Sequence, residues 1–271
     1  MKKFLGLLAL AGAVTFSGAN TLEQIKASNT LRIGVGERDA PMSSISKSGK
    51  FQGFEIELAK ELAKAILGDG GKVEFVAVKD AERMDAVTQN RVDLLIHNYS
   101  RTPEREKSMD FSMPYLSTMD AVVARKDLGV QRLSDLRGRR VLVVPGTSSE
   151  VALNKEPQIQ QVPCSTSKEC LDKLRAGEAD GYARKITVIA TIPFVDDRFE
   201  LAIKRIGAIA FNCVGTQKGN RDLMEIVDSK ILSLSQEGFF ADMYEQTFEL
   251  FYRGELEEKM FVLDDIYEAL L

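Results

Sequence analysis

The chain has 271 residues and carries 40 acidic against 36 basic side chains, a formal net charge of −4 with its one histidine neutral. This balance argues against nucleic acid or an anionic membrane surface as a partner, because both attract strongly basic proteins. The length is sufficient to bury one large hydrophobic core or two smaller ones, so two lobes are compatible with it.

The first 19 residues have the three-part pattern of a secretory signal peptide. Lys2 and Lys3 precede an apolar stretch at 4–16, and Ser-Gly-Ala follows at 17–19. The apolar stretch is shorter than the about 20 residues that span a membrane. We therefore predict cleavage near Ala19 and export to the periplasm, which leaves 252 residues with a formal charge of −6.

Three cysteines are too few for a scaffold built on disulfides. Export would permit one bridge, and Cys164 and Cys170 are close in sequence, which would leave Cys213 unpaired. The alternative is that each is a small buried apolar residue, the usual environment of a free cysteine. No spacing resembles a metal site, and we expect no cofactor.

Strands and helices alternate over the first third of the chain. Residues 31–35 alternate apolar and polar side chains, and from Phe54 the apolar positions recur at helical spacing until the glycines at 68–71. The predicted elements are a strand at 31–35, a loop at 36–53, a helix from 54, a strand at 73–78, a helix at 80–89 and a strand at 92–96. Such alternation is typical of a parallel sheet covered by helices.

The pattern then restarts, which favours a second lobe. The predicted elements are a strand at 141–144, a helix capped by Ser148 or Ser149, a helix at 167–176, a strand at 180–183 and a return strand at 206–214. The last 50 residues have mostly helical spacing.

Polar side chains gather directly after the strand at 92–96, in the stretch HNYSRTPER at 97–105. Ligands of such sheets bind beyond the carboxyl ends of the strands. Asn98, Ser100, Thr102 and Arg105 can present donors to one small anion if alternate residues leaving the strand point the same way. Arg105 can hold a carboxylate by two parallel hydrogen bonds. Thr102 can also cap a helix, which is compatible with this role.

Five segments together resemble the family 3 periplasmic solute-binding proteins, the polar amino acid receptors of ABC importers. The segments are GFEIELA at 53–59, TPER at 102–105, DFSMPY at 110–115, LSDLRGRRV at 133–141 and GTSS at 146–149. The resemblance covers nearly the whole chain after the predicted signal peptide.

The resemblance implies a type II periplasmic binding protein fold. Two α/β lobes, each a mostly parallel sheet covered by helices, are joined by crossing strands near 114–119 and 206–211 and close on a ligand by hinge motion. We expect lobe 1 to comprise 20–115 and 210–271, the latter with the C-terminal helices, and lobe 2 to comprise 116–209. The expected partner is an ABC permease in the inner membrane, and the expected state is a monomer without enzyme activity.

The resemblance also assigns half of a ligand site. In the family the arginine that matches Arg105 grips the ligand's α-carboxylate, and the positions of Asn98, Ser100, Thr147 and Ser148 assist it. The other half departs from the pattern, because Lys185 stands where the family usually has an aspartate for the ligand's ammonium. Two like charges 4 Å apart repel by about 1 to 4 kcal/mol, depending on screening.

Three interpretations of this departure remain open. Glu37, Asp39 or Asp80 can bind the ammonium from the opposite lobe, where the family often has aromatic residues near the last two positions. Alternatively, the ligand is a dicarboxylate or another anion that lacks an α-ammonium, and Arg184 or Lys185 meets its second anionic group. In the third interpretation both cations face solvent and the alignment is shifted by one residue.

Two further function classes also remain. This fold hosts periplasmic enzymes similar to cyclohexadienyl dehydratase, in which Glu37 or Lys185 would serve as a pocket acid. No complete catalytic set is visible: His97 lacks a nucleophile and an acid at recognisable spacing, and we expect it at the rim of a pocket. A sensor that delivers to a receptor would look the same in sequence.

Overall fold

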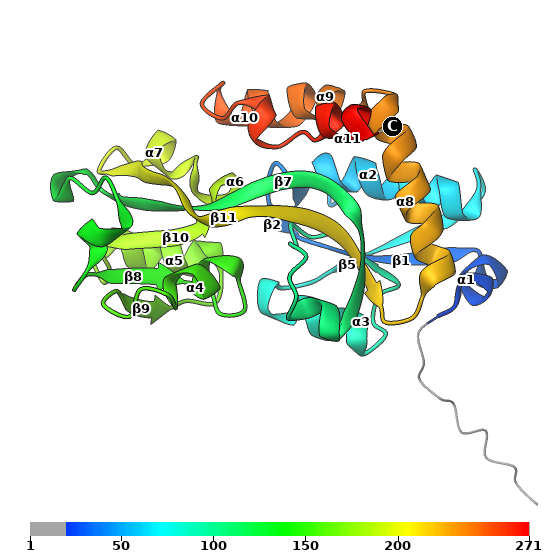
Figure 1. The fold of residues 1–271 in the computed structure, drawn as a ribbon, viewed down its shortest axis with the longest axis horizontal. Helices are drawn as coiled ribbons and strands as arrows, with labels where there is room; N and C mark the ends of the chain where they lie inside the picture. The colour runs from blue at the N-terminus through cyan, green and yellow to red at the C-terminus, as the bar shows by residue number, and fades with distance from the viewer. Residues whose placement is uncertain (1–19, 271) are drawn as a thin grey trace, which may run out of the picture.

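Two long antiparallel strands, β7 (Met109–Arg125) and β11 (Phe199–Gln217), run between two lobes and belong to both (Figure 1). The computed structural model describes residues 20–270, so the predicted signal peptide lies outside the described residues. One eight-stranded sheet passes through both lobes in the order β5-β1-β6-β11-β7-β10-β8-β9. The predicted crossings near 114–119 and 206–211 are therefore confirmed as parts of these two strands.

The first lobe has a parallel sheet flanked by helices, as predicted. Its strands are β1 (Thr30–Val35), β5 (Lys72–Ala77) and β6 (Leu94–Leu95), and its helices are α1 (Leu22–Ser28), α2 (Phe54–Leu67), η1 (Asp80–Glu82), α3 (Arg83–Thr88), η2 (Arg105–Lys107) and α8 (Arg221–Gln236). β1 pairs in parallel with β5 and β6. The segment predicted as a loop at 36–53 contains a small sheet of β2 (Arg38–Asp39), β3 (Ser43–Ile45) and β4 (Phe51–Gln52).

The second lobe repeats this arrangement on a smaller scale. Its elements are η3 (Lys126–Leu128), η4 (Leu133–Leu136), β8 (Arg140–Val143), α4 (Ser148–Leu153), β9 (Gln160–Pro163), α5 (Ser167–Arg175), β10 (Gly181–Lys185), α6 (Ile186–Ile189) and α7 (Ile192–Val195). β8 pairs in parallel with β9 and β10. The predicted cap of α4 was wrong by one residue: Thr147 is the N-cap, and its side chain accepts a hydrogen bond from the backbone of Glu150.

The C-terminal helices extend along the connecting strands (Figure 1). They are α9 (Phe239–Met243), the π-helical η5 (Tyr244–Glu249), α10 (Leu250–Tyr252), η6 (Glu258–Met260) and α11 (Asp264–Leu270). The backbone N–H of Ser117 in β7 donates to the carbonyl of Phe261 at 2.7 Å, and the Tyr252 hydroxyl donates to the carbonyl of Thr187 in lobe 2. This segment therefore contacts both a connecting strand and the second lobe.

The predicted lobe boundaries, after residues 115 and 209, fall inside β7 and β11, where the sheet is continuous. The division at these two residues stays a prediction. Within residues 20–270, none of the helices is both long and apolar enough to cross a membrane.

Cys164 and Cys170 form a disulfide, with their Cα atoms 5.3 Å apart, and Cys213 is free and buried. The bridge closes the loop that leads from β9 into α5. The buried apolar environment expected for an unpaired cysteine is thus confirmed for Cys213 alone.

Removing this bridge should lower the free energy of unfolding by about 2 kcal/mol. A bridge that closes a loop of this length restricts the unfolded chain, and without it the unfolded chain gains conformational entropy worth about that amount. The expected result is a lower free energy of unfolding in urea for the double variant Cys164→Ser/Cys170→Ser. A thiol reductant should lower the wild-type value similarly and leave the double variant unchanged. Equal unfolding midpoints for the oxidised wild type and the double variant would contradict the prediction.

Candidate functional site

Arg105 lies at the boundary between the lobes and is 8% exposed. Its Nη1 donates to the carbonyl of Ser100 at 2.6 Å, and its Nη2 donates to the carbonyl of Gly146, in lobe 2, at 3.0 Å. The guanidinium carbon lies 3.8 Å from the centroid of the Tyr99 ring. Burial lowers the pKa of Arg105 to about 10, so it is charged at neutral pH. These bonds occupy two of its five N–H groups, which leaves donors for a ligand carboxylate.

Ser100 contacts Arg105 through its backbone carbonyl, whereas the side chain of Asn98 contacts Asp39 and Thr187. Asn98 has φ 44°, in the left-handed region, so alternate residues after β6 do not simply point the same way. Its amide Nδ2 donates to Asp39 at 3.3 Å and to the Thr187 hydroxyl at 3.1 Å. The backbone of Asn98 is held by the buried Glu55, whose carboxylate accepts a hydrogen bond from the Asn98 N–H at 2.5 Å.

Thr102 is not the N-cap of η2, which is Glu104, but its side chain still bonds to the backbone of this helix. Its hydroxyl accepts a hydrogen bond from the backbone N–H of Arg105 at 3.3 Å, at the start of η2. This contact helps to fix the position from which the Arg105 side chain reaches the boundary between the lobes.

The hydroxyls of Thr147 and Ser148 both have protein partners. Thr147 donates to the carbonyl of Val144 at 2.7 Å, and Ser148 donates to the Asp120 carboxylate at 3.1 Å. Ser149 donates to the same carboxylate at 2.5 Å. Asp120, which sequence reasoning missed, therefore organises the start of α4 from β7.

Arg184 and Lys185 are 2% and 3% exposed, so the interpretation in which both cations face solvent is wrong. Arg184 pairs with Asp80 across the boundary between the lobes. The Lys185 ammonium donates to the Ser100 hydroxyl at 2.8 Å and to the side-chain carbonyl of Asn212 in β11. Burial lowers the pKa of Lys185 to about 7.

The three acids proposed from the sequence have different environments. Asp80 pairs with Arg184, Arg83 lies 3.4 Å away, and these cations hold its pKa well below the ordinary range against the effect of burial. Asp39 forms no ion pair within residues 20–270, and burial followed by the nearby Asp80 charge raises its pKa. Glu37 is half exposed and lies 3.6 Å from the neighbouring Arg38.

A cavity of about 340 Å³ separates the two lobes, within the size range of small-molecule sites. Lobe 1 contributes residues 36–39, 77–80, 82 and 97, and lobe 2 contributes residues 165–168 from the disulfide loop. Asp39, Asp80 and His97 line this cavity, whereas Arg105 and Lys185 do not. The acids predicted to bind an ammonium therefore line the cavity. The cations predicted to bind carboxylates, Arg105 and Lys185, are buried and do not line it.

His97 lines this cavity but is only 3% exposed, so it is not the exposed rim residue that we expected. Burial and then the positive charge of Arg83 lower its pKa to about 3, so the imidazole is neutral at physiological pH. Its Nε2 lies 3.6 Å from Asp80. In the described part of the chain, no three His, Cys, Asp or Glu side chains are grouped as a metal site.

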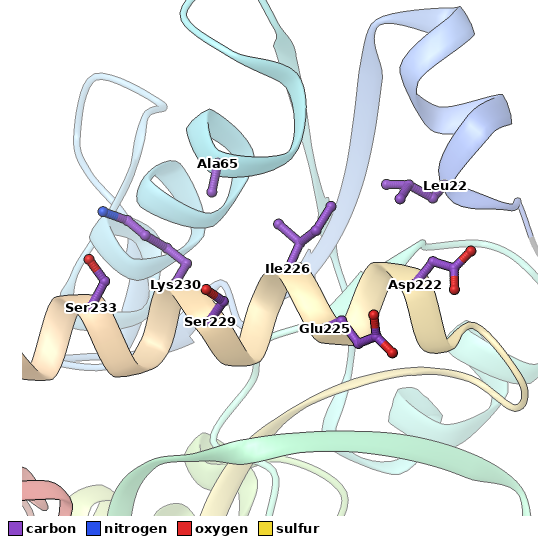
Figure 2. A pocket seen from close by; sticks show the side chains of 8 residues that line it. All are labelled: Leu22, Ala65, Asp222, Glu225, Ile226, Ser229, Lys230 and Ser233. Carbon is purple, nitrogen blue, oxygen red and sulfur yellow. The ribbon is translucent and has the colours of Figure 1, made fainter. Parts of the chain in front are cut away.

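A second hollow, of about 540 Å³, lies on the outer face of lobe 1. Figure 2 shows its side chains rising mainly from α8, with Leu22 and Ala65 opposite them. None of the residues predicted for the ligand site lines it.

Comparison with known proteins identifies the family. Residues 31–249 match the bacterial extracellular solute-binding proteins, family 3. The chain belongs to this family. Among its relatives, the glutamine-binding protein of Geobacillus stearothermophilus is 33% identical over 170 residues, which are 61% of this chain and 64% of that protein. The L-cystine-binding protein of Escherichia coli K12 is 27% identical over 89% of this chain and 91% of that protein.

Solved structures give the same result for this solute-binding protein. The receptor for L-cysteine of Neisseria gonorrhoeae superposes with a TM-score of 0.84 and 31% identity, over 89% of this chain and 99% of that one. An ancestral amino acid-binding protein described as a precursor of cyclohexadienyl dehydratase superposes with a TM-score of 0.74 and 26% identity, over 84% and 99% of the two chains. These relatives are binding proteins, and the last of them is related to an enzyme.

Proposed function

We propose that this protein is the periplasmic substrate-binding component of an ABC importer and that it captures an α-amino acid between its lobes. The observation that carries the proposal is Asp39, an acid without an ion-pair partner among residues 20–270, which lines the cavity between the lobes. An acid whose ionised form is disfavoured by burial gains from a cationic partner, and a ligand ammonium is such a partner.

Arg105 is the proposed partner of the α-carboxylate. It retains unoccupied N–H donors, stacks on Tyr99 and reaches a backbone carbonyl of the opposite lobe. Asn98 links Asp39 to the opposite lobe, because its amide contacts Asp39 and the lobe 2 residue Thr187. Opening of the lobes would give a ligand access to Arg105, and closure would enclose it.

The dicarboxylate alternative requires a free cation for the second anionic group. The Arg184 guanidinium pairs with Asp80, and the Lys185 ammonium has two protein partners, one of them on β11. A second carboxylate would have to replace these contacts, whereas an ammonium at Asp39 replaces no ion pair among the described residues. These contacts favour the interpretation in which an acid of lobe 1 binds the ligand's ammonium over the one in which the ligand is a dicarboxylate.

A thermal-shift screen tests the proposal. Amino acids should raise the unfolding temperature, and their des-amino analogues and dicarboxylic acids should not, because bound ligand stabilises by mass action. In Asp39→Asn the difference between an amino acid and its des-amino analogue should disappear. Glu37→Gln is the matched variant: if it removes the difference instead, Glu37 and not Asp39 binds the ammonium.

The enzyme alternative has its own test. Incubation of the purified protein with prephenate or arogenate should give no product, and dehydration of either compound would contradict the binding-protein assignment. A pull-down with the inner-membrane permease distinguishes delivery to an importer from delivery to a receptor.

A further inference from the structure

Eight ionisable side chains surround the boundary between the lobes, and their formal charges balance. The basic ones are Arg83, Arg105, Arg184 and Lys185, none more than 8% exposed. The acidic ones are Glu55 and Asp120, which are no more than 4% exposed, and Asp39 and Asp80, which line the cavity. With all eight groups ionised, four positive charges stand against four negative charges. Burial brings the pKa of Glu55 and of Lys185 to about 7 from opposite sides, so near pH 7 one negative and one positive charge are lost in parallel and the balance is kept.

These groups act on one another rather than as isolated pairs. Asp80 pairs with Arg184 and lies 3.4 Å from Arg83. Lys185 lies opposite Asp120 in the β10–β7 strand pair, and the Asp120 charge stabilises the protonated lysine. Because six of these groups are buried and Asp39 and Asp80 are only partly exposed, the sum of the charges matters for any ion that enters.

Charged residues at the cavity mouth contribute much less. The charged side chains there are 41% to 79% exposed, and water and salt screen them. They are Glu37, Arg38, Lys79, Glu82 and Lys168. The selection of a ligand by charge is therefore decided mainly by the eight groups at the boundary between the lobes.

We infer that the cleft selects amino acids with an uncharged side chain, and that the Asp80–Arg184 pair sets this selectivity. The inference rests on the proposed function. A zwitterion adds one positive and one negative charge and preserves the balance. A ligand with net charge would leave an uncompensated charge in a desolvated site, which is strongly unfavourable.

A buried polar atom beside the cavity indicates that the uncharged side chain is polar. His97 lines the cavity and is 3% exposed, and its Nδ1 has no hydrogen-bond partner in the described part of the chain. Buried polar atoms are normally paired, and a hydroxyl, thiol or carboxamide can pair with this one without bringing a charge.

Calorimetric titration at pH 7 and fixed salt tests the inference with a panel of ligands. The neutral members are L-cysteine, L-serine and L-glutamine, the anionic ones L-aspartate and L-glutamate, the cationic ones L-lysine and L-arginine, and succinate represents dicarboxylates. The tightest ligand should be neutral, with a Kd at least tenfold below that of any charged member.

Charge-altered variants should shift this preference in predictable directions. Asp80→Asn leaves an excess positive charge and should change the ratio of glutamine to glutamate affinity at least tenfold toward glutamate. Arg184→Gln should shift preference toward lysine by a similar factor. The double variant restores the balance and should again prefer neutral ligands. Asp85→Asn, an exposed acid on α3, is the matched control and should change nothing.

The outcomes separate the inference from the proposed function. If a charged amino acid binds most tightly to the wild type, the inference is overturned and amino acid binding stands. If only succinate binds, both are overturned. Circular dichroism identifies any single variant that does not fold, and in that case the wild-type panel and the double variant still decide.

Discussion

Replacing Arg105 with alanine is expected to abolish ligand-induced stabilisation while leaving the unliganded protein folded. Truncating one partner of a buried, hydrogen-bonded charge pair costs about 3 kcal/mol, equivalent to about 100-fold in affinity. A ligand present at 100 times its wild-type Kd, which stabilises the wild type by about 2.7 kcal/mol, should then produce little shift in the variant. The measurement is the unfolding temperature with and without ligand.

Arg101→Ala is the matched control for this experiment. Arg101 lies in the same segment, but its side chain is half exposed and pairs with Glu106. The control should therefore keep the full ligand shift. In Arg105→Ala the unliganded protein should lose some stability, because the carbonyls of Ser100 and Gly146 lose their donors. A normal ligand shift in Arg105→Ala would refute the assignment of the carboxylate site.

The sequence predicted those parts of the fold in which apolar periodicity is strong and local. α2 begins at Phe54 and ends at Leu67, before the predicted glycine stop, and its buried side chains follow the predicted helical face. The small sheet within 36–53 was missed, because its strands are two or three residues long and too short to show a period. β11 was predicted too short: the prediction covered 206–214, and the strand also includes 199–205 and 215–217.

The site was less predictable, because the contacts that shape it join distant positions. Arg105 stood out because it follows a strand in a polar segment. Asp120 gave no such indication: it occupies a position inside a long strand, and its partners Ser148 and Ser149 are 28 and 29 residues away. The Asp80–Arg184 pair spans 104 residues and exists only once the two lobes face each other.

For Lys185 the sequence gives the residue type, but only the structure shows which groups its ammonium contacts. Its identity predicted a departure from the family pattern, but its role depends on where the side-chain ammonium of the lysine lies. It binds Ser100 and Asn212 and so lies outside the cavity lining. No periodicity or motif could have distinguished this inward orientation from a position that faces the ligand.

The free energy of unfolding of Glu55→Gln, taken relative to that of the wild type, should increase as the pH rises from 4.5 to 7. Glu55 is fully buried in the first turn of α2, and this burial raises its pKa from the usual 4.5 to about 7. The groups that face it are Tyr115 and Asn98, which donate to its Oε1, and the charges of Asp39 and Lys185.

The sign follows from proton binding. Between pH 4.5 and 7 the native protein holds a proton on Glu55 that the unfolded chain has released. The contribution of Glu55 to stability is therefore fully present below pH 4.5 and is lost as the pH rises through 7, by at most about 3 kcal/mol. Glutamine does not titrate, retains an acceptor at the Oε1 position and replaces Oε2, which has no partner among the described residues.

Urea unfolding of both proteins at pH 4.5 and pH 7 measures this change. Lys185, whose pKa is lowered to about 7 by burial, begins to release its proton at the upper end of this window, and it and the remaining shifted acids are common to both proteins. Their effects cancel in the comparison, so the difference reports Glu55. Glu57→Gln, on the same helix and paired with Lys60 at the surface, should keep the wild-type pH dependence. If Glu55→Gln also kept it, the buried carboxyl would not carry the proton at neutral pH, and Asn98 would be held by a permanent carboxylate.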